Sequence, residues 1–329
     1  MKKIISILLC MLLALSLLSS CGGTQSENNN ENAQKKLSIV TTIFPVYDWV
    51  MEILGDTAES ADVKMLIDTG VDFHSFQPAT ADILSISEAD VFAFVGGESD
   101  KWIGDILSSS ENKTTVSVNL MEILGDKAKQ EEDKEGMEPS QDEDDEETEY
   151  DEHIWLSLKN AQLLVPAIAE KLCLADEENA GAYRENAEKY AEKLSALDKE
   201  YEEKIGEAKL DTLVFADRFP FRYLTDDYGL DYFAAFSGCS AESEASFKTV
   251  SFLAEKIDEK GLGCVLTTEG TDHSIAEAVI SSAKNGNAAI LSVDSLQSVT
   301  KTDVENGAKY LDIMEKNLGV FLEALNSEA

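Results

Sequence analysis

The 329-residue chain is strongly acidic, with 64 Asp and Glu residues against 27 Lys and Arg residues and a formal net charge of −37. Such a charge argues against nucleic acid and anionic lipid headgroups as partners and favours the attraction of cations. The length is sufficient for two domains that each bury a core of their own.

The first 20 residues have the layout of a secretory signal. Two lysines precede a mostly apolar run that is shorter than the roughly 20 residues needed to cross a bilayer. The run ends in Ser19-Ser20-Cys21, a small-residue cleavage site before Cys that is typical of bacterial lipoproteins. We therefore predict a signal peptide over 1–20, lipidation of Cys21 and a polar tether over 21–36. The protein is then expected on the extracytoplasmic face of the cell membrane, held by its lipid.

The region 37–174 alternates short β-rich runs with helical patterns. Predicted strands are 37–42, 62–67, 91–95 and 115–118, and predicted helices are 46–54, 82–89 and 102–107. This alternation predicts an N-terminal α/β lobe with a largely parallel sheet. Ligands of such sheets bind beyond the carboxyl ends of the strands, where we expect the loop that carries His74.

An acidic run within this lobe, 131–152, holds 14 acidic residues and one lysine in 22 positions. One interpretation is a solvated loop that cannot pack, because its like charges repel one another. The other is a low-affinity collector of cations, because clustered carboxylates are hard oxygen donors. Both interpretations stay open, and the run ends directly before His153.

A helical pattern begins near Lys159 and is interrupted by Pro166, which either kinks the helix or lies in its first turn. Beyond it, apolar residues recur at intervals of three and four from Ala180 to Ile205, with Glu and Lys on the other face. This predicts a helix of about 39 Å. We interpret 175–208 as a helix that links two lobes, in preference to a coiled-coil dimer.

The remaining segment, 209–329, returns to the α/β rhythm and predicts a C-terminal lobe. Predicted strands are 212–215, 232–236, 264–267 and 288–293, and predicted helices are 221–227, 247–259 and 275–283. A ligand site is expected in the cleft between the two lobes. Cys239 and Cys264 either form a disulfide in an oxidising exterior or remain buried free thiols.

Only three histidines occur in the chain, and each lies in a turn-like or polar segment. His74 is in a loop with Gly and Pro, His153 follows the acidic run, and His273 follows a predicted strand. If all three converge on one cleft, they predict a metal site. Imidazoles combined with carboxylates suit both zinc and manganese.

Several motifs occur in a fixed order over nearly the whole chain after Cys21. They are the lipobox, Thr41-Thr42 with Pro45, Gly55-Asp56, the His74 loop with Pro78 and Asp82, Ala89-Asp90 to Gly96 with Trp102, His153-Ile154-Trp155-Leu156, Tyr228-Gly229-Leu230 and Asp294-Ser295. This set resembles the zinc- or manganese-binding lipoproteins that serve bacterial ABC importers. The resemblance implies two α/β lobes joined by a backbone helix, and a metal held in the cleft by a monomer. It also implies an importer permease and ATPase as partners, and no enzymatic activity.

One position departs from the pattern of that family. The third metal ligand, usually His or Glu, falls on Arg218, and a guanidinium has no lone pair to give. Either another side chain completes the site or the cleft no longer binds bare metal. The expected ligands are His74, His153 and Asp294, with Glu269 or His273 as the replacement. Arg218 itself is expected to pair with a neighbouring carboxylate of Asp217, Glu269 or Asp294.

Two other functions use similar residues. A lipid-anchored metallohydrolase needs an open metal position and a general base, but the chain has neither a His-Glu-x-x-His helix nor a serine nucleophile elbow. A lipid-anchored adhesin needs no metal at all, because a fold does not determine its function.

Overall fold

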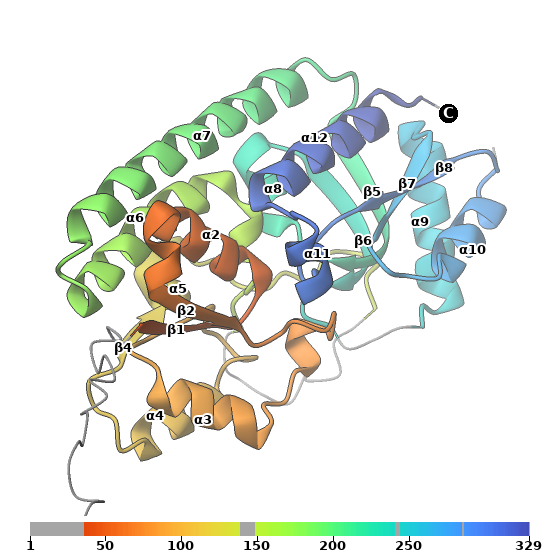
Figure 1. Cartoon of the computed structure of the whole chain (residues 1–329). Coiled ribbons are helices and arrows are strands. Elements are labelled where there is room, and N and C mark those ends of the chain that lie inside the picture. Colours follow the sequence, from red (N-terminus) through yellow and green to blue (C-terminus); the bar gives the residue numbers. More distant parts are fainter. Residues whose placement is uncertain (1–35, 139–148, 241–243, 285, 329) are drawn as a thin grey trace, which may run out of the picture. The chain divides into compact units, whose positions relative to one another are not determined.

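The computed structural model describes residues 36–138, 149–240, 244–284 and 286–328. The predicted signal peptide, Cys21 and the tether up to residue 35 lie outside these residues and remain predictions. The described chain forms two lobes, each built on a four-stranded parallel sheet with helices on its faces (Figure 1). None of the helices in the described ranges has both the length and the apolar character of a membrane span.

The first sheet has the strand order β2-β1-β3-β4. Its strands are β1 (Leu37–Thr41), β2 (Ala61–Met65), β3 (Val91–Phe94) and β4 (Val116–Asn119), and its helices are α2 (Phe44–Leu54), α3 (Thr80–Glu88), α4 (Trp102–Ser109) and α5 (Leu120–Leu124). β3 is buried along its whole length, as its continuous apolar run predicts. The central β1 lies between β2 and β3, so the loops that follow these strands meet at one edge of the sheet.

The second sheet has the order β6-β5-β7-β8, which repeats the topology of the first. Its strands are β5 (Thr212–Phe219), β6 (Asp231–Ser237), β7 (Cys264–Thr268) and β8 (Ala289–Val293), and its helices are α8 (Arg222–Tyr228), α9 (Phe247–Lys260), α10 (Ser274–Ser282) and α11 (Lys301–Glu305). Both predicted α/β lobes are thereby confirmed.

Two long helices, α6 (Leu158–Ala175) and α7 (Ala180–Gly206), connect the sheets. Ser157 caps α6 by accepting the backbone N–H of Asn160, so Pro166 lies in the helix interior and not in its first turn. The apolar stripe of α7 is buried as predicted. Asn186 bonds the end of α2, and Tyr201 bonds Met314 in the C-terminal part, so α7 contacts both lobes.

The C-terminal helix, α12 (Tyr310–Asn326), was not predicted. Its apolar residues follow helical spacing and pack into the same core as α7 and α2. Tyr310 is fully buried and donates its hydroxyl to the carbonyl of Trp155 at 2.6 Å. The last helix therefore supports the segment that carries His153.

The two ends of the acidic run are packed. Gln130 pairs with Tyr150 as an isolated antiparallel bridge, and Asp151 and Glu152 are each only 1% exposed. The expectation that this run cannot pack is therefore wrong at both ends, because hydrogen bonds and imidazole partners compensate the buried carboxylates. Residues 139–148, in its middle, lie outside the described ranges.

Candidate metal centre

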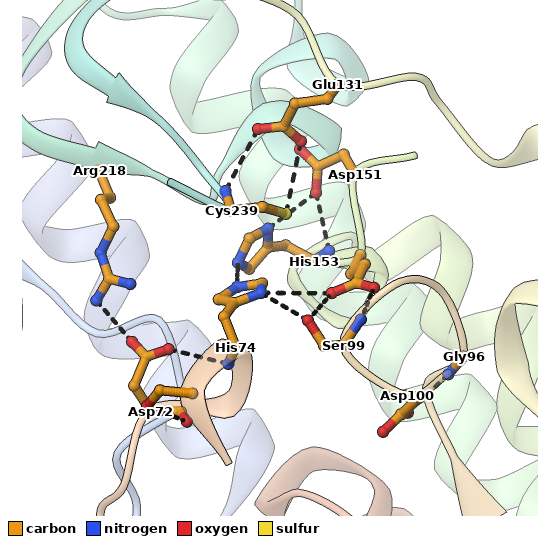
Figure 2. Close-up of polar contacts among 12 residues, drawn as sticks. Asp72, His74, Gly96, Ser99, Asp100, Glu131, Asp151, His153, Arg218 and Cys239 are labelled. Carbon is orange, nitrogen blue, oxygen red and sulfur yellow. Dashed lines mark hydrogen bonds and ion pairs between the residues drawn. The ribbon is translucent and has the colours of Figure 1, made fainter. Parts of the chain in front are cut away.

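Two histidine side chains face one another between the lobes. His74 lies in a short 3-10 turn, Phe73–Ser75, after β2, and His153 directly precedes another, Ile154–Leu156. Their Nε2 atoms are 3.1 Å apart (Figure 2). With metal–nitrogen bonds of about 2.0–2.1 Å, this separation corresponds to an angle of roughly 100° at a shared zinc ion, close to tetrahedral. The pair thus has the spacing of two ligands of one metal.

Carboxylates orient both imidazole rings at Nδ1, on the side of each ring opposite to Nε2. Nδ1 of His153 lies 2.9 Å from Oδ1 of Asp151, and Nδ1 of His74 lies 3.4 Å from Oε2 of Glu152 and 2.9 Å from the Ser99 hydroxyl. A proton held on Nδ1 by such a partner leaves the Nε2 lone pair free for a metal. This is the arrangement that metal-binding histidines generally have.

Glu152 is held in place by the loop that follows β3. Its carboxylate accepts the backbone N–H and the hydroxyl of Ser99, at 2.8 and 2.5 Å. Gly97 has φ +87°, and a Cβ there would come within 2.2 Å of Oε1 of Glu152. Glycine is required at this position because any larger residue would push the carboxylate away from His74.

The two histidines differ in proton affinity. Burial lowers the pKa of His74, and the neighbouring His153 lowers it further against the opposing effect of Glu152. Burial also acts to lower the pKa of His153, but the carboxylates of Asp151, Glu131 and Glu152 outweigh it, so this pKa lies above its usual value. His153 is therefore the imidazole at which protons compete more strongly with a metal.

Cys239 lies next to this pair. Among the described residues, it is the one side chain that joins His74 and His153 in a group whose ligand atoms all lie within 4.8 Å of one another. It follows β6, and the preceding Gly238 packs so closely that a Cβ there would be 3.0 Å from Cε1 of His153. The backbone of this loop thus approaches the buried imidazole directly.

Glu131 holds the Cys239 loop from the other side. Its Oε1 accepts the Cys239 backbone N–H at 3.3 Å, and its Oε2 lies 3.7 Å from Sγ (Figure 2). Burial raises the pKa of Glu131 to about 7, and the charge of Asp151 adds to this effect. Burial and the charges of Glu131, Asp151 and Glu152 also keep the pKa of the Cys239 thiol well above its usual value.

The three cysteines in the described part of the chain form no disulfide with one another. Cys173, Cys239 and Cys264 are all free, so of the two alternatives for Cys239 and Cys264 the free thiols are correct. Cys264 is buried on β7, whereas Cys239 is partly exposed at the site.

Among the described residues, three of the predicted metal ligands, Glu269, Asp294 and His273, lie outside the group of ligand atoms within 4.8 Å of one another that contains the histidine pair. Glu269 accepts bonds from the backbone and hydroxyl of Ser295, both at 2.7 Å, and from Ser298 at 2.8 Å. Oδ1 of Asp294 accepts the Leu296 N–H, and burial beside Glu269 raises its pKa to about 6. Both carboxylates thus organise the loop after β8.

His273 lies on the wall of the same cleft as His74. It directly precedes α10 with φ 61°, and its Nδ1 is 3.2 Å from the Thr267 hydroxyl. The cleft has a volume of about 670 Å³, and its lining also includes Arg218 and Asp72. His273 therefore shares the cleft with His74 but not the cluster of ligand atoms.

The partner of Arg218 differs from the predicted ones. Its guanidinium bonds Oδ2 of Asp72 at 2.6 Å (Figure 2). The carboxylate of Asp217 accepts only the backbone N–H of Arg218. Asp217 is occupied by the backbone and hydroxyl of Thr268, which explains why it does not pair with the guanidinium.

Sequence reasoning missed Cys239, Glu131, Asp151 and Ser99 as parts of the site. A signal for Asp151 was present, because Asp-x-His places a carboxylate two residues before the imidazole. A signal for Cys239 was its position after the predicted strand 232–236, at the carboxyl edge of a parallel sheet. Glu131 carried no signal, because 14 acidic residues share its run.

Comparison with known proteins bears on this geometry. The model of a family described as "ZnuA: Zinc-uptake complex component A periplasmic" matches residues 39–324. The "Zinc-binding lipoprotein AdcA" of Streptococcus pneumoniae TIGR4 is 31% identical over the whole chain but over only 62% of its own length, so this chain spans less than two thirds of that relative. The "High-affinity zinc uptake system protein ZnuA" of Bacillus subtilis is 26% identical, with 94% of each chain covered.

Solved structures agree on the fold. The Zn(II)-bound ZnuA-like domain of Streptococcus pneumoniae AdcA has a TM-score of 0.70 at 28% identity, over 89% of this chain and all of that one. The metal-dependent lipoprotein YcdH from Bacillus subtilis has a TM-score of 0.71 at 25% identity, over 88% of this chain and all of that one. These matches confirm the two-lobed α/β architecture with a joining helix.

Proposed function

Because the chain belongs to the family of periplasmic component A of zinc-uptake complexes, we propose that it captures zinc outside the cytoplasm and delivers it to an ABC importer. The importer's permease and ATPase are its partners. The lipobox at Cys21 and the lipoprotein name of the AdcA relative support attachment to the membrane by a lipid.

One observation carries the proposal. His74 and His153 present their Nε2 atoms to one another at 3.1 Å, while carboxylates hold both Nδ1 atoms. Preoriented imidazoles of this kind bind zinc without first reorganising. Zinc is favoured over manganese as the cargo because the relatives carry zinc in their names.

Transport accounts for the site better than the two alternatives considered above. A zinc-uptake family has no need of the general base that a metallohydrolase requires. A metal-free adhesin would leave the carboxylate–imidazole contacts without a purpose, and buried charged groups are costly unless they are paired.

Thermal unfolding with and without zinc tests metal binding. A ligand that binds only the folded state stabilises it by RT ln(1 + [L]/Kd), which is about 2.7 kcal/mol at 100 times Kd. We expect zinc to raise the Tm of the parent protein, His74→Ala and His153→Ala to lose most of this shift, and His273→Ala to keep it. No shift in the parent, or a full shift in both of the first two variants, would contradict the proposal.

Delivery to an importer needs a test in cells. Deleting the gene is expected to slow growth in medium depleted of zinc by a chelator, and added zinc should restore it. The intact gene should complement the deletion, whereas His153→Ala should not. Normal growth of the deletion strain under zinc depletion, in the absence of a second uptake system, would argue against the transport function.

A further inference from the structure

We propose that Cys239 supplies a third, thiolate ligand to the metal ion held by His74 and His153. This inference rests on the proposed zinc-binding function and adds to it a ligand and a metal preference. The sequence pattern of the family gives no reason to expect a thiolate at this site.

The three side chains lie close enough to share one metal ion. The ligand atoms of the three side chains lie within 4.8 Å of one another, and His153 is fully buried. In a tetrahedral site with bonds of about 2.3 Å to sulfur and 2.0–2.1 Å to nitrogen, neighbouring ligand atoms are roughly 3.3–3.6 Å apart. The cluster therefore needs to contract by only about one ångström to enclose a metal ion.

Cys239 can replace the donor that is lost at Arg218. Arg218 is on β5 and pairs in register with Phe236 of β6, the strand that Cys239 follows. The guanidinium bonds Asp72 (Figure 2), and it cannot ligate a metal. The replacement donor thus comes from the end of the neighbouring strand, in the same sheet.

The surroundings of Cys239 favour a cation. The carboxylates of Glu131, Asp151 and Glu152 surround Cys239 and the two histidines. The side chains of Asp151 and Glu152 are buried. A bound dication offsets this accumulation of negative charge, and a metal ion deprotonates a coordinating thiol. On binding, the S–H bond breaks, a metal–sulfur bond forms with the same electron pair, and the proton passes to solvent.

A thiolate also determines which metals the site prefers. Soft sulfur donors favour zinc, whereas manganese prefers carboxylate, carbonyl and water oxygens. A site with two imidazoles and one thiolate is therefore expected to bind zinc much more tightly than manganese. With only the two imidazoles and nearby carboxylates, this preference would be weaker.

Cobalt(II) substitution of the purified protein tests the inference, because a cobalt–thiolate bond gives an intense charge-transfer absorption in the near ultraviolet. Cys239→Ser is compared with Cys173→Ser as a matched control. Cys173 is a buried thiol on α6 that donates to the Ala180 carbonyl, which a serine hydroxyl can also do. Circular dichroism of the metal-free variants shows whether each one folds, and Cys239→Ala provides a second variant if the serine is not tolerated.

We expect the parent and Cys173→Ser to show the absorption, and Cys239→Ser to lose it. Cys239→Ser should also bind zinc at least about tenfold more weakly and discriminate less against manganese. A parent that binds zinc and cobalt without the absorption, or a folded Cys239→Ser variant with parental zinc affinity, would overturn the inference but leave the zinc-binding function intact. A parent that binds neither metal would overturn both.

Discussion

Arg218 and Asp72 form an ion pair between the two lobes, with 2.6 Å between Nη2 and Oδ2. The other oxygen of Asp72 accepts the backbone N–H of His74 at 2.9 Å. Arg218, at the position of the family's third metal ligand, thus holds the loop that carries His74 by way of Asp72. Burial acts to raise the pKa of Asp72, but the hydrogen bond and charge of Arg218 outweigh it and lower this pKa.

Asp72→Asn is predicted to weaken zinc binding by about tenfold, the lower end of the range for groups that position a metal ligand. The amide oxygen can still accept the His74 N–H, but the ion pair with Arg218 is lost. Competition with a chelator of known affinity measures the change. The control is Glu170→Gln, which breaks the exposed ion pair with Arg184; an equal loss in both variants would show that the interlobe pair has no particular role.

Zinc affinity should fall on acidification at a higher pH than an ordinary histidine would produce. The pKa of His153 is raised above the ordinary histidine value of 6.5, and its proton must leave before Nε2 can bind a metal. Asp151→Asn removes the strongest of the effects that raise this pKa, so the pH at which affinity is half lost should move downward. At pH 8 the same variant should bind about 10- to 100-fold more weakly, because the ring loses its orienting carboxylate.

Zinc titrations between pH 5.5 and 8.5 measure both effects of Asp151→Asn. Asp176→Asn is the control, since its carboxylate bonds Asn179 and Tyr183, outside the site. If the affinity of Asp151→Asn and of the parent falls at the same pH, His153 is not the group at which protons compete with the metal.

The acidic run is predicted to have two separable roles. Deleting 139–148, which holds six acidic residues, should leave tight zinc binding unchanged and remove weak binding that is sensitive to salt. Glu131→Gln should weaken the tight binding, because Glu131 holds the Cys239 loop. Isothermal titration at low and high salt separates the two classes of site, and a loss of tight binding in the deletion variant would refute this division.

Asp100 should make the protein less stable as the pH rises. Burial raises its pKa from 3.8 to about 7, with a further contribution from the charge of Glu152. The folded state therefore binds this proton more tightly than the unfolded state does, and the resulting stability is present below about pH 4 and lost as the pH rises to about 7. Asp100→Asn should remove this loss, so its stability relative to the parent should increase over that range by as much as about 4 kcal/mol.

Denaturant unfolding at pH 5 and pH 7.5 measures the effect of Asp100→Asn. Asp62→Asn, at an exposed position on β2, is the control and should follow the parent at both values. A constant difference between Asp100→Asn and the parent across this range would mean that Asp100 is charged in the folded protein throughout.

Local patterns predicted the elements of the fold but only part of the site. The strands and helices around His74 and the helix 180–206 follow from apolar periodicity, which depends on neighbours in sequence. The same periodicity extends to α12, in Tyr310, Ile313, Met314 and Phe321. The pairing of Arg218 with Asp72 spans 146 positions, and the contact of Glu131 with Cys239 spans 108 positions. Contacts between residues so far apart in sequence leave no local pattern.

The most direct test of zinc capture by the histidine pair is a crystal structure of the zinc-loaded protein, with anomalous diffraction recorded at the zinc edge. The account predicts one strong anomalous peak between the lobes, about 2.0–2.1 Å from Nε2 of both His74 and His153. A peak bound instead by Glu269, His273 or Asp294 without this pair would contradict it, as would zinc bound only at exposed carboxylates.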